Sequence, residues 1–352
     1  MNAPTQDQLK SILESAILAP SADNHHRVRF EWGGGVLNVR HAAGPLPPAE
    51  GYKRVLSLLS LGALSENLTL AAGRFGIKAE PELSPDSTNS DLAFQVRWQP
   101  GDVTTDPLRE AIPKRHTNRH LIFHGPTLSV EEQTSLGQAA SGLPDCSLVW
   151  LDGRPLRRQA LRLMRLAEGE RFRNRLLHEE LFSAIRFDVG WRQSCEEGLP
   201  PGALEIERPL RSVFALLHHW PVMRVVNMLG GHRLLGLRAA DLPCRFSPHL
   251  GLIAVERVID QTIFNAGRSF ERVWLTATQL GFALQPMPAA ALYALKGAQQ
   301  EGISGVLQQR LQQGWQAIVP GQQPLMLFRI GRAAPSALRT GRKPLEHYIS
   351  RG

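Results

Sequence analysis

The spacing of apolar residues predicts the first elements of the chain. Over residues 7–18 apolar side chains recur every three or four positions, which predicts an amphipathic helix that ends at Pro20. The stretches VRFEW and VLNV flank three glycines at 33–35, and this pattern predicts a β-hairpin. Residues 55–72 are apolar nearly all round, so we expect a buried central helix with Gly76 as its C-terminal cap.

Later segments continue this mixture of helices and strands. The stretches LAFQVRW at 92–98, LVWL at 148–151 and PLMLFRI at 324–330 have the composition of strands. Ser129 and Glu132 have the spacing of a capping box, which predicts that a helix begins there.

One segment of the chain is repeated. Residues 62–81 align without gaps on residues 267–286, at a constant offset of 205 positions. The identical pairs are Gly62/Gly267, Glu66/Glu271, Leu70/Leu275, Ala72/Ala277, Gly76/Gly281 and Pro81/Pro286. The offset is too long for a solenoid repeat, so the alignment favours two related halves, each with a buried helix that runs into a strand. Chance similarity between two helices rich in leucine and alanine is the alternative.

The composition excludes several classes of protein. The net charge of +8 raises the question of nucleic acid, but no basic run is interleaved with aromatic residues and no known nucleic-acid motif occurs, so we expect no such partner. The densest basic stretch, residues 154–175, has leucines at near-helical spacing. It is either an amphipathic helix with a solvated arginine face or a rim that steers anionic ligands.

We expect a cytoplasmic protein with no membrane partner. The N-terminus is polar, and a proline, an arginine and an asparagine interrupt the most apolar window, residues 216–231. The cysteines Cys146, Cys195 and Cys244 are odd in number and widely spaced, which suggests reduced thiols rather than disulfides. HEELF at 178–182 lacks the second histidine of a zinc-protease helix, so we expect no metal site.

The stretch KRHTNRHLIF at 114–123 carries the most specific chemistry. Arg115 and Arg119 lie four residues apart, with the hydroxyl of Thr117 between them. Guanidinium groups hold phosphate oxygens through two parallel hydrogen bonds, more firmly than ammonium groups do. The cluster therefore predicts an anion site.

With this cluster the sequence resembles the nitroreductase family, which consists of FMN-dependent flavoproteins that normally work as homodimers. The cluster matches the Arg-x-Ser/Thr-x-Arg element that binds the flavin phosphate. APSADNHHRVRF at 19–30 matches a stretch that closes over the flavin from the partner subunit, although His26 replaces a glutamine, Arg27 a proline and Val28 a tryptophan. The helix from Gly267 to Gly281 and the basic stretch TGRKPLE also match family segments.

The resemblance assigns a set of residues to FMN binding. They are Pro20, Ser21, Asn24, Arg115, His116, Thr117, Arg119, Gln285, Pro286, Met287 and Arg342. In many members a backbone N–H just after the proline of the third segment bonds flavin N5. If Pro288 takes that place it has no N–H to donate, so either Met287 or Ala289 serves instead or the redox behaviour is altered.

The resemblance implies an α+β fold, a nitroreductase-like α/β sandwich with two related halves fused in one chain, as in the Acg-like branch. We expect halves at 1–105 and 106–352, with a lid or insertion at about 152–250 that is helical, then loop-like. The closing stretch occurs only in the first half, and the phosphate cluster and Arg342 only in the second. We therefore expect one FMN per chain, in a monomeric pseudo-dimer or a homodimer.

The resemblance also implies a function. We expect an FMN-dependent oxidoreductase that passes electrons from NAD(P)H to a small organic acceptor, such as a nitroaromatic or a quinone. The alternatives are a specialised biosynthetic dehydrogenase or oxidase and a non-catalytic protein that stores or sequesters FMN. No catalytic residue is assigned, because the flavin supplies the chemistry. The insertion residues that could line a substrate pocket are Trp191, His218, His219, Trp220 and Arg224. We expect most of them to be core residues and at most two to contact a ligand.

Overall fold

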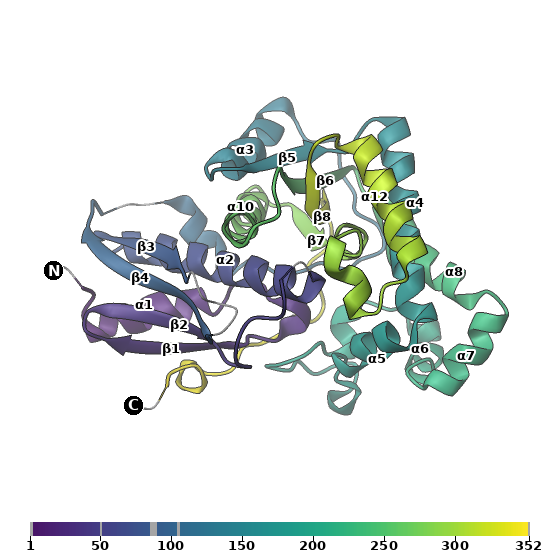
Figure 1. Ribbon diagram of the computed structural model, residues 1–352, viewed down its shortest axis with the longest axis horizontal. Coiled ribbons are helices and arrows are strands. Elements are labelled where there is room, and N and C mark those ends of the chain that lie inside the picture. The colour runs from purple at the N-terminus through teal and green to yellow at the C-terminus, as the bar shows by residue number, and fades with distance from the viewer. Residues whose placement is uncertain (1–2, 50, 85–89, 104–105, 351–352) are drawn as a thin grey trace.

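The computed structural model describes residues 3–49, 51–84, 90–103 and 106–350, and contains two four-stranded antiparallel sheets (Figure 1). The strands are β1 (Val28–Gly33), β2 (Val36–His41), β3 (Ile77–Leu83), β4 (Leu92–Pro100), β5 (Cys146–Trp150), β6 (His249–Val255), β7 (Ala283–Pro286) and β8 (Gln323–Gly331). The sheet orders are β1-β2-β4-β3 and β5-β6-β8-β7, so both sheets connect equivalent strands in the same way.

Helices complete the same pattern in both halves. In the first half α1 (Gln6–Ala16) precedes β1 and α2 (Tyr52–Gly73) lies between β2 and β3. In the second half α3 (Val130–Ser141) precedes β5 and α10 (Asp260–Gln279) lies between β6 and β7. This shared topology confirms the α+β fold with two related halves and argues against chance similarity between two helices. The expected boundary at residue 105 lies outside the described residues.

The two repeated helices, α2 and α10, pack against each other at a pair of equivalent glycines. A Cβ added to Gly62 would collide with the carbonyl oxygen of Phe264, and one added to Gly267 would collide with that of Leu59. Phe264 is the repeat equivalent of Leu59, so each helix makes the same contact on the other. Such reciprocity defines an isologous interface about a local two-fold axis. Only glycine allows the two backbones to approach this closely.

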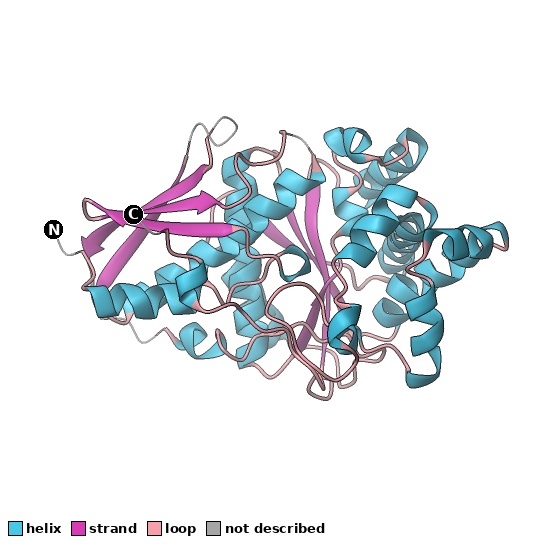
Figure 2. Cartoon of the chain, turned by 90° about the horizontal axis from the view of Figure 1, so that it is seen from below, coloured by secondary structure: helices cyan, strands magenta, loops and turns pink. Residues whose placement is uncertain are grey.

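The second half contains two additions that the first half lacks. Between β5 and β6 lie α4 (Arg154–Arg173), α5 (Arg175–Ser183), α6 (Arg211–Leu216), α7 (Trp220–Met228), α8 (Gly231–Gly236) and α9 (Leu242–Arg245). Between β7 and β8 lie α11 (Ala289–Leu292) and α12 (Gly305–Ile318). Figure 2 shows these helices gathered at the end of the molecule opposite the first sheet. The insertion is more helical than expected, since short helices continue to residue 245.

Most of the individual elements agree with the apolar pattern. The hairpin β1–β2, the strands β4, β5 and β8, and the capping box of Ser129 and Glu132 are confirmed. Gly76 is not the cap of α2: the helix ends at Gly73 with Arg74 as its cap, and Gly76 has φ +66° in the turn into β3. α2 is long and apolar enough to cross a membrane, but most of it is buried inside the fold, as in the core helix of a globular protein.

The chain after β8 returns to the first half. Phe30 of β1 forms a parallel bridge with Ile349, and the Phe30 amide donates to the carbonyl oxygen of Tyr348 at 2.6 Å. This C-terminal segment therefore lies along the edge of the first sheet, as Figure 1 shows. The halves are held together by backbone hydrogen bonds as well as by the packing of α2 on α10.

Candidate functional site

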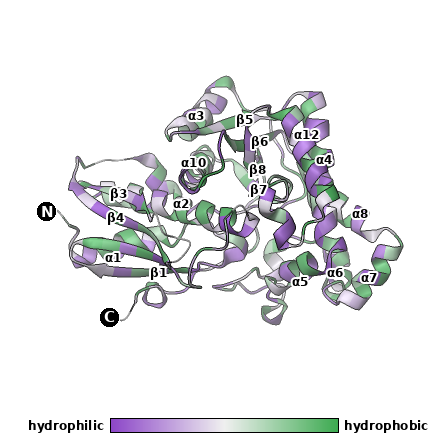
Figure 3. Cartoon of the chain, viewed as in Figure 1, coloured by the Kyte–Doolittle hydropathy of each residue, from purple (hydrophilic) through white to green (hydrophobic). Residues whose placement is uncertain are grey.

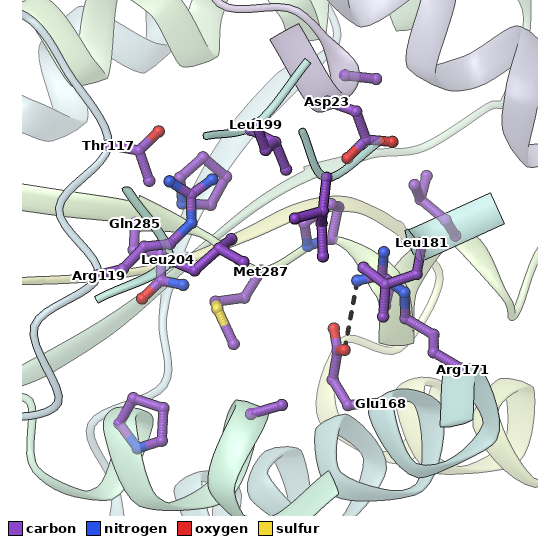
Figure 4. Close-up of a pocket in the computed structure, with 18 of the residues that line it drawn as sticks. Asp23, Thr117, Arg119, Glu168, Arg171, Leu181, Leu199, Leu204, Gln285 and Met287 are labelled. Carbon is purple, nitrogen blue, oxygen red and sulfur yellow. Dashed lines mark hydrogen bonds and ion pairs between the residues drawn. The ribbon is translucent and has the colours of Figure 1, made fainter. Parts of the chain in front are cut away.

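A cavity of about 500 Å³ is lined by residues of both halves and of the insertion. The first half contributes the loop 20–23 and one face of α2, and the second contributes residues 117 and 119, α10 and the loop after β7. Apolar side chains make most of its wall, and a few polar groups converge on it (Figure 4). Concave apolar sites of this size with few polar groups are typical of small-molecule and cofactor sites.

Seven of the eleven residues assigned to FMN binding line this cavity. They are Pro20, Ser21, Thr117, Arg119, Gln285, Pro286 and Met287. They come from three segments that are far apart in the sequence, and the fold brings the segments to one place.

Arg119 provides a positive charge at the side of the cavity where Thr117 and Gln285 lie (Figure 4). Its Nη1 donates to the carbonyl oxygen of Ala203 at 3.3 Å, and among the described residues no carboxylate lies within ion-pair distance. Burial lowers the pKa of the Arg119 guanidinium, while Asp23 and Glu205 oppose this effect from farther away. A desolvated cation without a direct counterion favours an anionic ligand.

Backbone pairing places Thr117 and Arg119 beside β7. Thr117 forms a parallel bridge with Leu284, and the Asn118 amide donates to the Leu284 carbonyl at 3.2 Å. Gln285 follows directly, and its Oε1 accepts from Nε of the fully buried Arg329 at 2.7 Å. This bond fixes the orientation of the Gln285 amide, so its Nε2 is the group left to donate toward a ligand.

The loop on the opposite side of the cavity is strained and has an unsatisfied hydroxyl. Asp23 and Asn24 adopt φ of 51° and 60°, in the left-handed region that non-glycine residues seldom occupy. Ser21 Oγ is buried and has no hydrogen-bond partner within the described ranges. Strain and orphaned polar groups are both features that cluster at ligand sites.

Arg115 does not line the cavity. Its Nε lies 3.1 Å from Oε1 of the buried Glu271, its Nη2 donates to the Leu18 carbonyl at 2.7 Å, and its guanidinium stacks on Trp274. Burial raises the pKa of Glu271 to about 7, while Arg115 opposes this shift. Arg115 therefore neutralises a buried carboxylate of the repeated helix, and the structure gives it a packing role rather than a place at the cavity wall.

Three more of the assigned residues lie outside the cavity wall. Arg342 donates through Nε to the Ile17 carbonyl and through Nη2 to the Ala19 carbonyl, both at 2.9 Å, so it caps the end of α1. Asn24 bonds Arg342 instead of facing the cavity. The ring of His116 bonds the Lys114 carbonyl at 2.9 Å through Nδ1.

An ion pair of α4 and a hydrogen bond between α2 and α5 also lie at the cavity wall, and the sequence analysis did not predict them. Arg171 lies 3.4 Å from Glu168 on α4, at the side of the cavity away from Arg119 (Figure 4). The Tyr52 hydroxyl donates to Glu180 at 3.0 Å. In the arginine-rich stretch, Glu168 and Arg171 are three residues apart, which is the spacing of an ion pair on one face of a helix. This spacing could have revealed the pair from the sequence. That helix is amphipathic, with Arg171 at the cavity and other arginines exposed.

The five insertion residues that could line a substrate pocket do not line the cavity. They are Trp191, His218, His219, Trp220 and Arg224. The insertion side chains that do line it are mainly aliphatic and phenylalanine, among them Phe172, Leu181 and Phe214. Trp191 and Trp220 are half-buried, and His218, His219 and Arg224 are exposed, so none of the five lines this cavity and most of them do not belong to the core either.

The loop after β7 limits which backbone amides can meet a ligand. The Met287 amide donates to the Leu327 carbonyl at 2.7 Å, and Pro288 has no N–H. Ala289 lines the cavity at the start of α11. Of the two amides considered from the sequence, Ala289 is therefore the one not used by the sheet.

Comparisons with known proteins give distant similarities. No family model matches the chain. The chain is 25% identical over 362 residues to the uncharacterised protein MT1398 of Mycobacterium tuberculosis (strain CDC 1551 / Oshkosh); the match covers 99% of this chain and 49% of that protein, so the chain spans about half the length of this curated relative.

Three of the solved structures that match are described as binding or depending on a flavin. The FMN-dependent nitroreductase NfnB of Mycobacterium smegmatis, in complex with NADPH, matches at a TM-score of 0.39 and 17% identity, over 71% of this chain and 100% of that one. A BluB-like flavoprotein from Clostridium difficile 630 matches at a TM-score of 0.40 and 13% identity, over 69% of this chain and 98% of that one. A nitroreductase with bound FMN from Desulfitobacterium hafniense DCB-2 matches at a TM-score of 0.35 and 13% identity, over 71% of this chain and 100% of that one. These TM-scores and identities are too low to assign a property of the matched proteins to this chain.

Proposed function

We propose that this chain is an FMN-dependent oxidoreductase of the nitroreductase type, with one flavin held in the cavity between its related halves. The observation that carries the proposal is the convergence of three separated segments, represented by Ser21, Arg119 and Gln285, on one cavity. These are the segments that resemble the flavin-binding elements of the nitroreductase family. We further propose halves at 1–105 and 106–352, acting as a single-chain pseudo-dimer.

The side chains present fit FMN at several points. Arg119 and Thr117 would hold the phosphate, because a guanidinium that has no carboxylate partner among the described residues and a neighbouring hydroxyl suit an anionic oxygen cluster. The buried Ser21 Oγ has a hydrogen-bonding capacity that the described residues leave unused. Pro286 and Met287 supply an apolar wall for a planar ring.

The reaction would divide between the cofactor and the protein. A bound FMN would supply the transfer of electrons from NAD(P)H to a small organic acceptor. The chain's residues would bind and orient the flavin: the Gln285 amide, fixed by Arg329, could donate to a polar ring atom, and the Ala289 N–H could take the place of the amide that Pro288 lacks. The aliphatic side chains of the insertion exclude water from the space beside the ring.

A second candidate is a protein that binds FMN without turnover. One observation favours it: the Met287 amide is engaged with Leu327 and Pro288 has none, which leaves a single amide for tuning the ring. A specialised dehydrogenase or oxidase is a variant of the first proposal in which the insertion shapes the site for one substrate.

An absorption spectrum and an anaerobic titration separate these candidates. The proposal predicts a yellow protein that NADPH or NADH bleaches and that a quinone or nitroaromatic reoxidises. Yellow protein that neither nicotinamide reduces would favour the specialised enzyme or the binder. Colourless protein without affinity for added FMN would reject every flavin-based function.

A further inference from the structure

The helices α6, α7 and α8 form one corner of the molecule (Figure 1). Several of their apolar side chains are exposed to solvent. We call this the apolar corner and define it by Val213, Leu216, Val225, Met228, Leu229 and Leu234. Leu229 is 87% exposed and Met228 75%. Figure 3 shows hydrophobic stretches on α6 and α7 at this end, far from the first sheet.

The spacing of these residues shows that the exposure is organised. Val213 and Leu216 are three residues apart on α6, and Val225 and Met228 are three apart on α7. Residues three or four apart share one face of a helix, so each helix has an outward apolar face. Other side chains of the same helices pack inward: Phe214 of α6 and Val222 and Val226 of α7 lie against the buried cluster of the insertion.

The charge of the same segment has one sign. Between Arg208 and Ala240 the sequence contains five arginines and no acidic residue, while Glu207 and Asp241 flank this segment and Glu207 pairs with Arg238 at 2.7 Å. Arg208, Arg224 and Arg233 are exposed beside the apolar side chains. Apolar side chains on short helices flanked by arginines are the composition of segments that lie in the interface of an anionic bilayer.

The corner also adjoins the cavity. Leu210 and Val213 line the cavity and are 48% and 56% exposed, so the cavity reaches the surface at this point. Phe214, Leu217 and Leu235 continue the apolar lining inward. A ligand that enters here passes along aliphatic and phenylalanine side chains, which suits a lipophilic molecule better than a polar one.

We propose that the apolar corner docks on an anionic lipid membrane and that the cavity receives a lipophilic acceptor of the quinone class from it. This revises the expectation of no membrane partner. The docking stands on the corner alone, whereas the acceptor rests on the proposed function. In the reaction NAD(P)H gives up a hydride, and the quinone gains two electrons and two protons, one of them from solvent, to become a quinol.

Vesicle sedimentation tests the docking. Vesicles of phosphatidylcholine alone and of phosphatidylcholine mixed with phosphatidylglycerol are incubated with the protein at low and high salt. We expect binding to the mixed vesicles that weakens with salt, and binding by the variant Met228→Glu/Leu229→Glu that is weaker by about tenfold or more. Val306→Glu, at a position 72% exposed on α12, is the matched control and should bind as the natural chain does.

Two results would overturn the docking. One is natural protein that stays in the supernatant with both kinds of vesicle. The other is vesicle binding that Met228→Glu/Leu229→Glu leaves unchanged while circular dichroism shows the variant folded. If sedimentation velocity instead shows that the natural chain is a dimer and the double variant a monomer, with no vesicle binding by either, the corner is an interface between copies and the proposal is wrong.

The acceptor is tested separately. Reduction of a long-chain quinone embedded in mixed vesicles should fall in Met228→Glu/Leu229→Glu, while reduction of a short-chain, water-soluble quinone should not change. Equal loss with both quinones would contradict delivery through the corner. Vesicle binding without reduction of either quinone would reject the oxidoreductase function and still support docking.

Discussion

At the scale of single residues, the two arginines of the phosphate cluster have different surroundings. Arg119 faces the cavity without a carboxylate partner in the described part of the chain, whereas Arg115 is paired with the buried Glu271. We expect Arg119→Ala to bind FMN about 10- to 100-fold more weakly, since a hydrogen bond to a charged group contributes about 1.5–3 kcal/mol. Flavin fluorescence quenching measures the affinity. Arg310→Ala, at an exposed position on α12, is the control. Unchanged affinity in Arg119→Ala would place the phosphate elsewhere.

Arg115→Ala should act on stability. Removing one partner of a buried ion pair typically costs about 3–5 kcal/mol. Without Arg115 the pKa of Glu271, already raised to about 7 by burial, rises further. A carboxyl whose folded pKa exceeds its unfolded value loses stability as pH increases, so the variant should be more destabilised at about pH 8 than at about pH 6. Urea unfolding at both values measures this. A variant as stable as the natural chain would show that the pair is not formed.

We expect His26 to make the free energy of unfolding depend on pH in the acidic range. Burial first, then Arg342, Arg115 and His25, lower the pKa of His26 well below 6.5. A histidine whose folded pKa is below its unfolded value stabilises the fold above pH 6.5, and this stability is lost as pH falls. We expect the free energy of unfolding to decrease below pH 6.5 by up to about 1.4 kcal/mol per pH unit from this group. His26→Gln should flatten the decrease; an equally steep decrease would assign it to other groups.

At the scale of elements, the crossing of α2 and α10 positions the cavity. Gly62→Ala or Gly267→Ala places a methyl group against the backbone of the other helix, so we expect destabilisation of about 1–3 kcal/mol or more. Gly137→Ala on α3, with nothing within 4 Å of its added Cβ, is the control and should be about 0.5–1 kcal/mol more stable. Thermal unfolding of the three variants measures their relative stability. Equal stability of Gly62→Ala and Gly137→Ala would contradict the close crossing.

Elements with strong periodicity were predictable from the sequence, and their partners were not. The repeat identified α2 and α10 because buried helices leave an unbroken apolar pattern. The short helices of the insertion were missed beyond α4, since α6, α7 and α8 last only six to nine residues and expose apolar faces that obscure the usual pattern. The motif predicted that arginines would meet an anion, but only the tertiary pairing of Arg115 with Glu271 shows which arginine is already neutralised.

At the scale of the whole molecule, the central claim is that two related halves enclose one flavin site. The first half supplies Ser21, and the second supplies Arg119 and Gln285. The pairing of Phe30 with the C-terminal segment connects the halves within one chain, so a complete site should form without a second molecule.

Titration of FMN into apoprotein, followed by fluorescence quenching and by mass in solution, tests this claim most directly. We predict saturation at one FMN per chain, with an affinity that does not depend on protein concentration. Saturation at two FMN per chain, or no binding at all, would contradict the account.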